Sequence, residues 1–79
     1  MPWTSKFKTP LTLKDGRAIE TLAEARDVIL GLPDYQQRRD YWGYAATLLM
    51  GAAQSGKREA IEDAYWQLMR ALNMDRMLS

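Results

Sequence analysis

Two arginines stand among four aromatic rings in the segment YQQRRDYWGYA, residues 35–45. Cations interleaved with aromatic side chains are typical of surfaces that bind single-stranded nucleic acid, because the cations contact phosphates while the rings stack on bases. Together with Lys57 and Arg58 further along the chain, Arg38 and Arg39 form a candidate basic patch. The segment also fits the first turns of an amphipathic helix. We favour that interpretation, because helical spacing separates the rings from the cations.

Residue types that carry catalysis or bind metals are scarce. The 79 residues contain neither cysteine nor histidine, which removes thiolate chemistry, the commonest general base and the commonest metal ligands. The segment GAAQSGK, residues 51–57, has phosphate-loop spacing, but Arg58 follows where serine or threonine is required. The neighbouring carboxylates Glu59, Glu62 and Asp63 fit a solvated helix face. We therefore expect no catalytic, cofactor-binding or metal-binding residues, and a protein that is not an enzyme.

Charge and hydrophobicity narrow the class further. Eleven basic and ten acidic residues give a net charge of +1, whereas a dominant phosphate-binding role usually shows a clear basic excess. No segment approaches the roughly 18 to 20 apolar residues that span a bilayer, and the N-terminus has no apolar run of the signal-peptide kind. The composition predicts a small globular protein in the cytoplasm with no membrane association.

The elements that position these residues begin with a β-hairpin in PLTLKDGRAIET, residues 10–21. A two-residue loop would place Ile19 on the face opposite Leu11, so that half of the apolar set would be exposed. A three-residue loop that ends at Gly16 pairs Leu11 with Ile19 and keeps both on one face with Phe7. We therefore predict the three-residue loop, with Gly16 in the left-handed region.

Three helices are predicted after the hairpin. Thr21 and Glu24 have the spacing of a capping box at the start of the first helix, which Gly31 and the following proline end. The second helix is expected over about residues 35–54 and the third over about residues 57–72.

The predicted fold is a single α+β domain over residues 1–79, an N-terminal β-hairpin packed against three α-helices in the order β-β-α-α-α. Trp42 is the expected core anchor of the second helix. Asn73 is a plausible left-handed terminator of the third. Residues 1–5 and 74–79 are expected to fray.

One tryptophan does not follow the apolar face of its helix. Trp66 points with the charged residues of the third helix, and Met69 lies beside it, while Tyr44 is expected on the exposed side of the second helix. Because an exposed tryptophan is a common hot spot of protein contacts, these three residues form a candidate protein interface. The alternative is that the C-terminal tail folds back over Trp66 through Met74 or Met77.

The order of the elements is similar to that of a known family. The hairpin, the segment ETLAEARDVILGLP and the segment DAYWQLMRALNM together resemble the small alphaproteobacterial domain-of-unknown-function family numbered 982. In that family a strand pair leads into a short helix that ends in Trp-Pro, then an alanine-rich helix and a last helix with an Ala-Arg pattern. Here Leu32 and Pro33 stand where Trp-Pro would, whereas Ile61 and Glu62 depart from Ala-Arg. The resemblance implies this fold and a bacterial origin, and no established activity.

The sequence favours a non-enzymatic protein-interaction module that binds a protein partner or self-associates as a homodimer. The contact is expected to use Trp66 and an edge of the hairpin, because a two-stranded sheet keeps unpaired backbone groups along its outer edges. The alternative is a nucleic-acid-binding accessory or regulatory protein that uses the basic patch Arg38, Arg39, Lys57 and Arg58.

Overall fold

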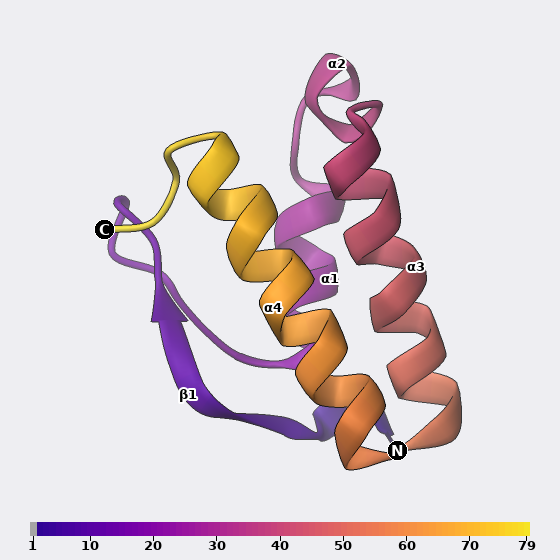
Figure 1. Cartoon of the computed structure of the whole chain (residues 1–79). Helices are drawn as coiled ribbons and strands as arrows, with labels where there is room; N and C mark the ends of the chain where they lie inside the picture. The colour runs from indigo at the N-terminus through magenta and orange to yellow at the C-terminus, as the bar shows by residue number, and fades with distance from the viewer. Residues whose placement is uncertain (1) are drawn as a thin grey trace.

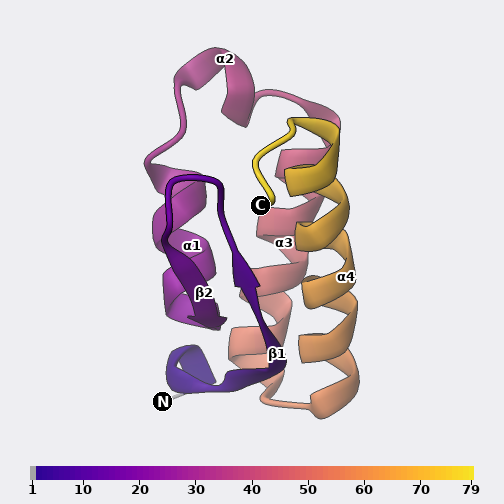
Figure 2. The same ribbon diagram turned by 90° about the vertical axis from the view of Figure 1, so that its left-hand side faces the viewer.

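A computed structural model describes residues 2–79, and its hairpin followed by helices confirms the predicted α+β class (Figure 1). The elements in chain order are the 3-10 turn η1 Pro2–Thr4, strands β1 Lys6–Thr12 and β2 Ala18–Thr21, and helices α1 Leu22–Leu30, α2 Asp34–Gln37, α3 Asp40–Ser55 and α4 Arg58–Met74. The hairpin packs on α1 and α4, and α3 lies against the far side of these two helices (Figure 1, Figure 2). The buried side chains form one cluster between the hairpin and the helices.

The hairpin has the predicted three-residue loop. The N–H of Leu13 donates to the carbonyl of Arg17 at 2.8 Å, and the N–H of Gly16 donates to the carbonyl of Leu13 at 3.0 Å. Leu11 pairs with Ile19. Gly16 has a φ of +93°, which glycine adopts without the steric penalty of a Cβ atom. This register buries the four apolar side chains on the face toward the helices: Phe7, Leu11, Leu13 and Ile19.

Helix α1 begins with the predicted capping box. The N–H of Glu24 donates to the hydroxyl of Thr21 at 3.2 Å, and the N–H of Thr21 donates to the carboxylate of Glu24 at 3.1 Å. Both bonds satisfy amide groups that a helix start otherwise leaves without partners. The helix ends at Gly31, as predicted. Its buried side chains follow helical spacing: Leu22, Ala25, Val28 and Ile29.

The prediction of one continuous second helix over residues 35–54 is wrong. The segment forms two helices, α2 and α3. Arg39 leaves the helical conformation, with φ −67° and ψ 139°, and precedes the new helix start at Asp40. A single helix over residues 35–54 would hold two arginines in its first turn, where cations oppose the helix dipole. The break replaces them there with Asp40 and frees the Arg39 side chain to pair with Asp75 at 2.6 Å.

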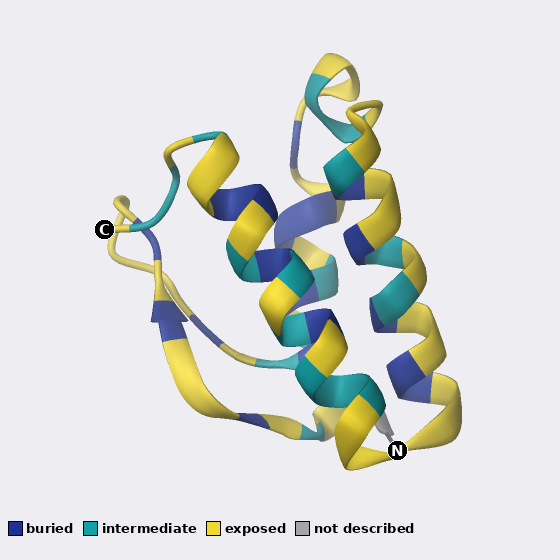
Figure 3. Ribbon diagram, viewed as in Figure 1, coloured by how far each residue is buried: buried dark blue, intermediate teal, exposed yellow. Residues whose placement is uncertain are grey.

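Helices α3 and α4 form an antiparallel pair joined at Gly56, whose φ is +67° (Figure 1). Trp42 is fully buried, which confirms its assignment as the core anchor of α3. Small side chains let the two helix backbones approach closely, and larger ones fill the remaining core. The buried alanines of the pair are Ala45, Ala52, Ala53, Ala64 and Ala71. Figure 3 shows buried residues recurring along both helices.

The end of α4 differs from the prediction. Asn73 remains helical, and the left-handed residue is Arg76, with a φ of +56°. The N–H of Met77 donates to the carbonyl of Leu72 at 2.8 Å, and the N–H of Arg76 donates to the carbonyl of Asn73 at 3.1 Å. This pair of bonds is the Schellman motif. It turns the chain sharply out of the helix and back toward the hairpin.

The C-terminal residues, which the sequence predicts to fray, bond to the hairpin in the structure. The N–H of Lys14 donates to the carbonyl of Met77 at 2.9 Å, and the N–H of Ser79 donates to the carbonyl of Thr12 at 3.0 Å. Leu78 bridges Leu13 in antiparallel fashion. Residues 77–79 thus occupy part of the outer edge of β1, which the sequence predicted to be open.

The N-terminal residues 2–5 are also held, and Met1, part of the segment predicted to fray, lies outside the described residues. Trp3 is half-buried against the core, and the guanidinium of Arg26 lies 4.7 Å from the centre of its ring. The N–H of Leu22 donates to the carbonyl of Ser5 at 3.1 Å. Residues 2–5 therefore pack as part of the fold.

Candidate functional site

Trp66 lies on the outward side of α4, where its side chain is 62% exposed. Ala64 and Leu68, two positions before and after it, are fully buried. Because two residues span about 200° of a helix, a side chain between two core positions faces solvent. The C-terminal tail does not cover Trp66, since Met77 packs against the core and residues 77–79 bond to the hairpin.

The structure brings the three predicted interface residues together on one face. A shallow hollow of about 410 Å³ is lined by Tyr44 and Leu48 from α3 and by Trp66 and its charged neighbours from α4. An adjoining hollow of about 350 Å³ is lined by Trp66, Met69 and Met74. Tyr44 and Met74 are more than half exposed, whereas Met69 is half-buried. We call this surface the Trp66 face and define it by Tyr44, Leu48, Asp63, Trp66, Met69, Arg70 and Met74.

Edge-on and tilted aromatic contacts support Trp66 from the hairpin side. The ring of Tyr65 meets that of Trp66 edge-on, with centres 5.5 Å apart. The buried ring of Phe7 on β1 lies 5.2 Å from the ring of Tyr65. Because such aromatic contacts favour defined geometries, the exposed indole is supported by the core through two rings. The indole of the Trp66 face therefore rests on a ring that itself contacts the core.

Two opposite charges flank Trp66 along α4. Asp63 lies three residues before it and Arg70 four residues after it, and both line the same hollow with it. They are seven residues apart, or about 10 Å along the helix axis, and therefore lie on opposite sides of the indole. Within residues 2–79 neither side chain has an ion pair.

The predicted basic patch is not one surface. Arg38 and Arg39 precede α3 and Lys57 and Arg58 follow it, so the two pairs lie at opposite ends of a helix about 24 Å long. Arg39 is bound to Asp75. The prediction that these four residues form one patch is therefore wrong, because the length of α3 separates the two pairs.

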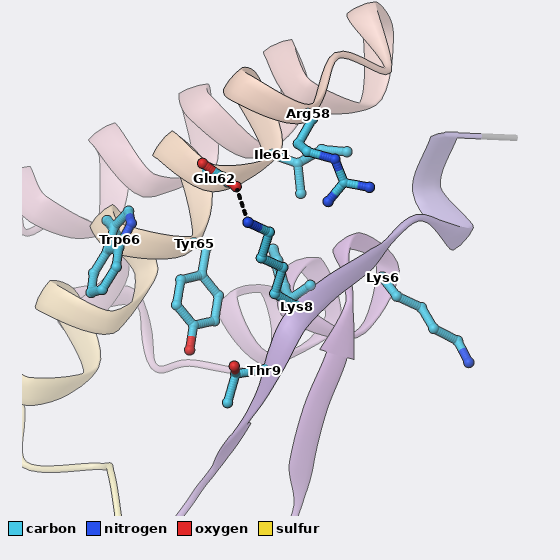
Figure 4. A pocket seen from close by; sticks show the side chains of 9 residues that line it. Lys6, Lys8, Thr9, Arg58, Ile61, Glu62, Tyr65 and Trp66 are labelled. Atoms are coloured by element: carbon cyan, nitrogen blue, oxygen red, sulfur yellow. Dashed lines mark ion pairs between the residues drawn. The ribbon is translucent and has the colours of Figure 1, made fainter.

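A different set of cations meets aromatic rings in the β1–α4 cleft, a hollow of about 270 Å³ (Figure 4). Arg58 from α4 shares the cleft with Lys6 and Lys8 from β1, and Tyr65 and Trp66 line it too. The cleft also holds the carboxylate of Glu62, which pairs with the Lys8 ammonium at 3.1 Å. Lys6 points away from the other labelled side chains (Figure 4). Sequence reasoning missed the two lysines, since only tertiary packing brings β1 beside α4.

A buried carboxylate ties the end of α4 to the helices α2 and α3. The side chain of Asp75 is 3% exposed. One oxygen, Oδ2, accepts hydrogen bonds from the indole N–H of Trp42 at 2.6 Å and from the amide of Gln36 at 2.7 Å. The other, Oδ1, accepts from the guanidinium of Arg39 at 2.6 Å and from the hydroxyl of Tyr41. We call these five residues the Asp75 cluster.

The Asp75 cluster is suited to structure and not to proton transfer. Burial alone would raise the pKa of Asp75, but the hydrogen bonds from Trp42, Tyr41, Gln36 and Arg39 outweigh it and lower that pKa to about 2. A carboxylate that stays ionised near neutral pH and whose lone pairs already meet four donors is a poor general base. One feature of the sequence points to this cluster, because a buried tryptophan such as Trp42 needs a hydrogen-bond acceptor for its N–H.

Another hollow, of about 310 Å³, is apolar and lies between η1, α1 and α3. Its rim includes the exposed side chains Leu30 and Met50, with Arg26 stacked over Trp3. Among residues 2–79, no cluster of three or more acidic side chains is arranged to hold a metal ion. Over the same residues, no helix combines the length and apolar character needed to cross a membrane.

Comparisons with known proteins give no relative for this chain: no protein family, curated protein or solved structure matches it. The resemblance to the family numbered 982 therefore stays a prediction, and so does the bacterial origin that it implies.

Proposed function

We propose that this protein is a non-enzymatic protein-interaction module that binds through the Trp66 face. The observation that carries the proposal is the 62% exposure of Trp66, with Tyr44 and Met74 exposed beside it. Burial of apolar surface contributes about 25 cal/mol per Å², and monomers rarely leave such groups exposed in one contiguous patch without a function. Tryptophan and tyrosine are also the residue types that dominate binding hot spots.

The support beneath this face favours binding further. Trp66 projects from a helix of 17 residues, and its ring is held by contact with Tyr65. A side chain that is ordered before binding loses less conformational entropy when a partner covers it. The face therefore has both the apolar area and the rigidity that a protein contact needs.

The proposal is tested by sedimentation velocity over a wide range of protein concentrations. We expect wild type to self-associate as concentration rises and Trp66→Ser to stay monomeric. Tyr35→Ser is the matched control, because Tyr35 is an equally exposed aromatic ring in α2, outside the Trp66 face. A wild type that is monomeric at every concentration, with its sedimentation unchanged by Trp66→Ser, would contradict the proposal.

Nucleic-acid binding is the second candidate, and the β1–α4 cleft favours it. A cation and two rings line one hollow there, Arg58 with Tyr65 and Trp66, and single-stranded nucleic acid requires cations and rings on one surface. Against it, the chain carries a net charge of only +1.

Titration with a single-stranded homopolymer at several salt concentrations tests this candidate. Phosphate contacts predict an affinity that falls steeply with salt, and weaker binding by Arg58→Glu. The absence of binding at low salt would remove this candidate and leave the first.

A further inference from the structure

We infer that the partner of the Trp66 face is a second copy of this chain, bound with the two α4 helices antiparallel about a two-fold axis at Trp66. This inference rests on the proposed function, and it adds the identity and orientation of the partner. In a two-fold interface each residue i meets a residue j of the other copy, and j meets i. A surface can bind its own copy in this way only if its charges complement one another across the axis.

The charges of α4 have this arrangement. All three acidic residues of the helix, Glu59, Glu62 and Asp63, come before Trp66. Of its two arginines, Arg58 is the first residue of the helix, and Arg70 comes after Trp66. Along the helix axis Asp63 lies about 4.5 Å to one side of Trp66 and Arg70 about 6 Å to the other side. When two copies run antiparallel, each Asp63 therefore meets the Arg70 of the other copy, and the two indoles meet at the axis.

A dimer with the two α4 helices parallel would not have complementary charges across the interface. It would place Asp63 opposite Asp63 and Arg70 opposite Arg70, and like charges across an interface oppose binding. Within the monomer these two side chains have no ion pair among residues 2–79, and the indole separates them. Each is therefore free to pair across the interface.

The dimensions of the face suit a dimer. A specific interface buries about 800 Å² per partner, which is about one-sixth of the 5089 Å² surface of this chain. Helix α4 is about 25 Å long, comparable with the 29 Å longest dimension of the molecule. Tyr44 and Leu48 of α3 widen the face beside it. Two such copies form an antiparallel arrangement of four helices, a common packing of helix pairs.

The hairpin edge is a weaker candidate for the same contact. The C-terminal residues already bond to Thr12 at the end of β1 and to Lys14 in the hairpin loop, and Pro10 has no N–H to donate. Pairing between sheet edges of two copies would therefore start from an edge that the chain itself partly covers. The Trp66 face has no such internal competitor.

Charge reversal tests the orientation. We expect Asp63→Arg and Arg70→Asp each to raise the dimer dissociation constant about tenfold or more, because each places like charges opposite one another. An equimolar mixture of the two variants, and the double variant in one chain, restore opposite charges and should dimerise like wild type. Glu20→Arg, on the exposed face of β2, is the control and should dimerise unchanged.

The outcomes separate this inference from the proposal beneath it. Circular dichroism on each variant verifies that the fold is retained, which we expect because Asp63 and Arg70 are both exposed. If wild type dimerises and both single variants dimerise equally well, the antiparallel inference is wrong while the interaction module stands. If wild type never self-associates, both are wrong.

Discussion

Asp75→Asn removes the charge of the Asp75 cluster with almost no change in shape. Each carboxylate oxygen accepts two hydrogen bonds, Oδ2 from Trp42 and Gln36, and Oδ1 from Arg39 and Tyr41. An asparagine keeps one acceptor oxygen and replaces the other with an NH₂ group. In either orientation of the amide, two donors of the cluster would therefore face a donor.

The magnitude follows from the pKa and from the hydrogen bonds. The pKa of Asp75 is lowered from its ordinary 3.8 to about 2, and at 1.36 kcal/mol for each pKa step this corresponds to about 2 kcal/mol at neutral pH. A buried polar group left without its partner costs about 1 to 3 kcal/mol. We therefore expect Asp75→Asn to lower the free energy of unfolding by roughly 2 to 4 kcal/mol at pH 7, a large part of the stability of a small domain.

The loss of unfolding free energy caused by Asp75→Asn should become smaller as the pH falls. The folded-state pKa of Asp75 lies below the unfolded-state value, so its contribution is fully present above pH 3.8 and is lost as the pH falls through about 2. The difference in stability between wild type and variant should therefore narrow as the pH falls from about 4 to about 2.

Urea unfolding followed by tryptophan fluorescence measures this at several pH values. Glu20→Gln is the control, because it removes one carboxylate from an exposed side chain of β2 and should leave the midpoint nearly unchanged at pH 7. The reasoning is refuted if Asp75→Asn unfolds at the wild-type midpoint at pH 7. It is also refuted if the deficit of the variant stays constant down to pH 2.

Three substitutions test the backbone assignments by urea unfolding. Gly16→Ala should destabilise by about 1 kcal/mol because φ is +93° there, whereas Gly51→Ala, in open space within α3, should stabilise by about 0.5 to 1 kcal/mol. Equal effects of the two would show that the loop does not need a positive φ. Arg76→Gly should stabilise by roughly 1 kcal/mol, since Arg76 is held at a φ of +56° that glycine adopts freely. Destabilisation by Arg76→Gly would mean that its side chain makes a contact worth more than the backbone strain.

The structural features that could be predicted from the sequence are those that depend on residues close together in the chain. The hairpin register follows from parity, because only the three-residue loop puts Leu11 and Ile19 on one face. The capping box follows from Thr21 and Glu24, three residues apart. The outward direction of the Trp66 side chain follows from helical spacing, since the core positions on either side of it fix that direction.

The features that were missed depend on residues far apart in the chain. The break at Arg39 accompanies its pairing with Asp75, 36 residues later. The sequence around Arg39 shows only two adjacent arginines within a pattern that predicts a helix. Likewise, Lys8 and Glu62 form an ion pair in the β1–α4 cleft only because the hairpin packs on α4. No spacing within β1 or within α4 indicates that contact.

The same long-range contacts decide whether Trp66 is open. After α4 the C-terminal residues could pack against either of two apolar surfaces, the indole of Trp66 or the hairpin. The sequence alone favoured neither. The left-handed Arg76 turns the chain away from the helix, and Met77 then bonds to Lys14 in the hairpin loop. The buried Asp75 fixes the position from which that turn begins. The polar cluster at one end of the helix pair thus leaves the apolar surface near its middle uncovered, which is the condition that the proposed interaction requires.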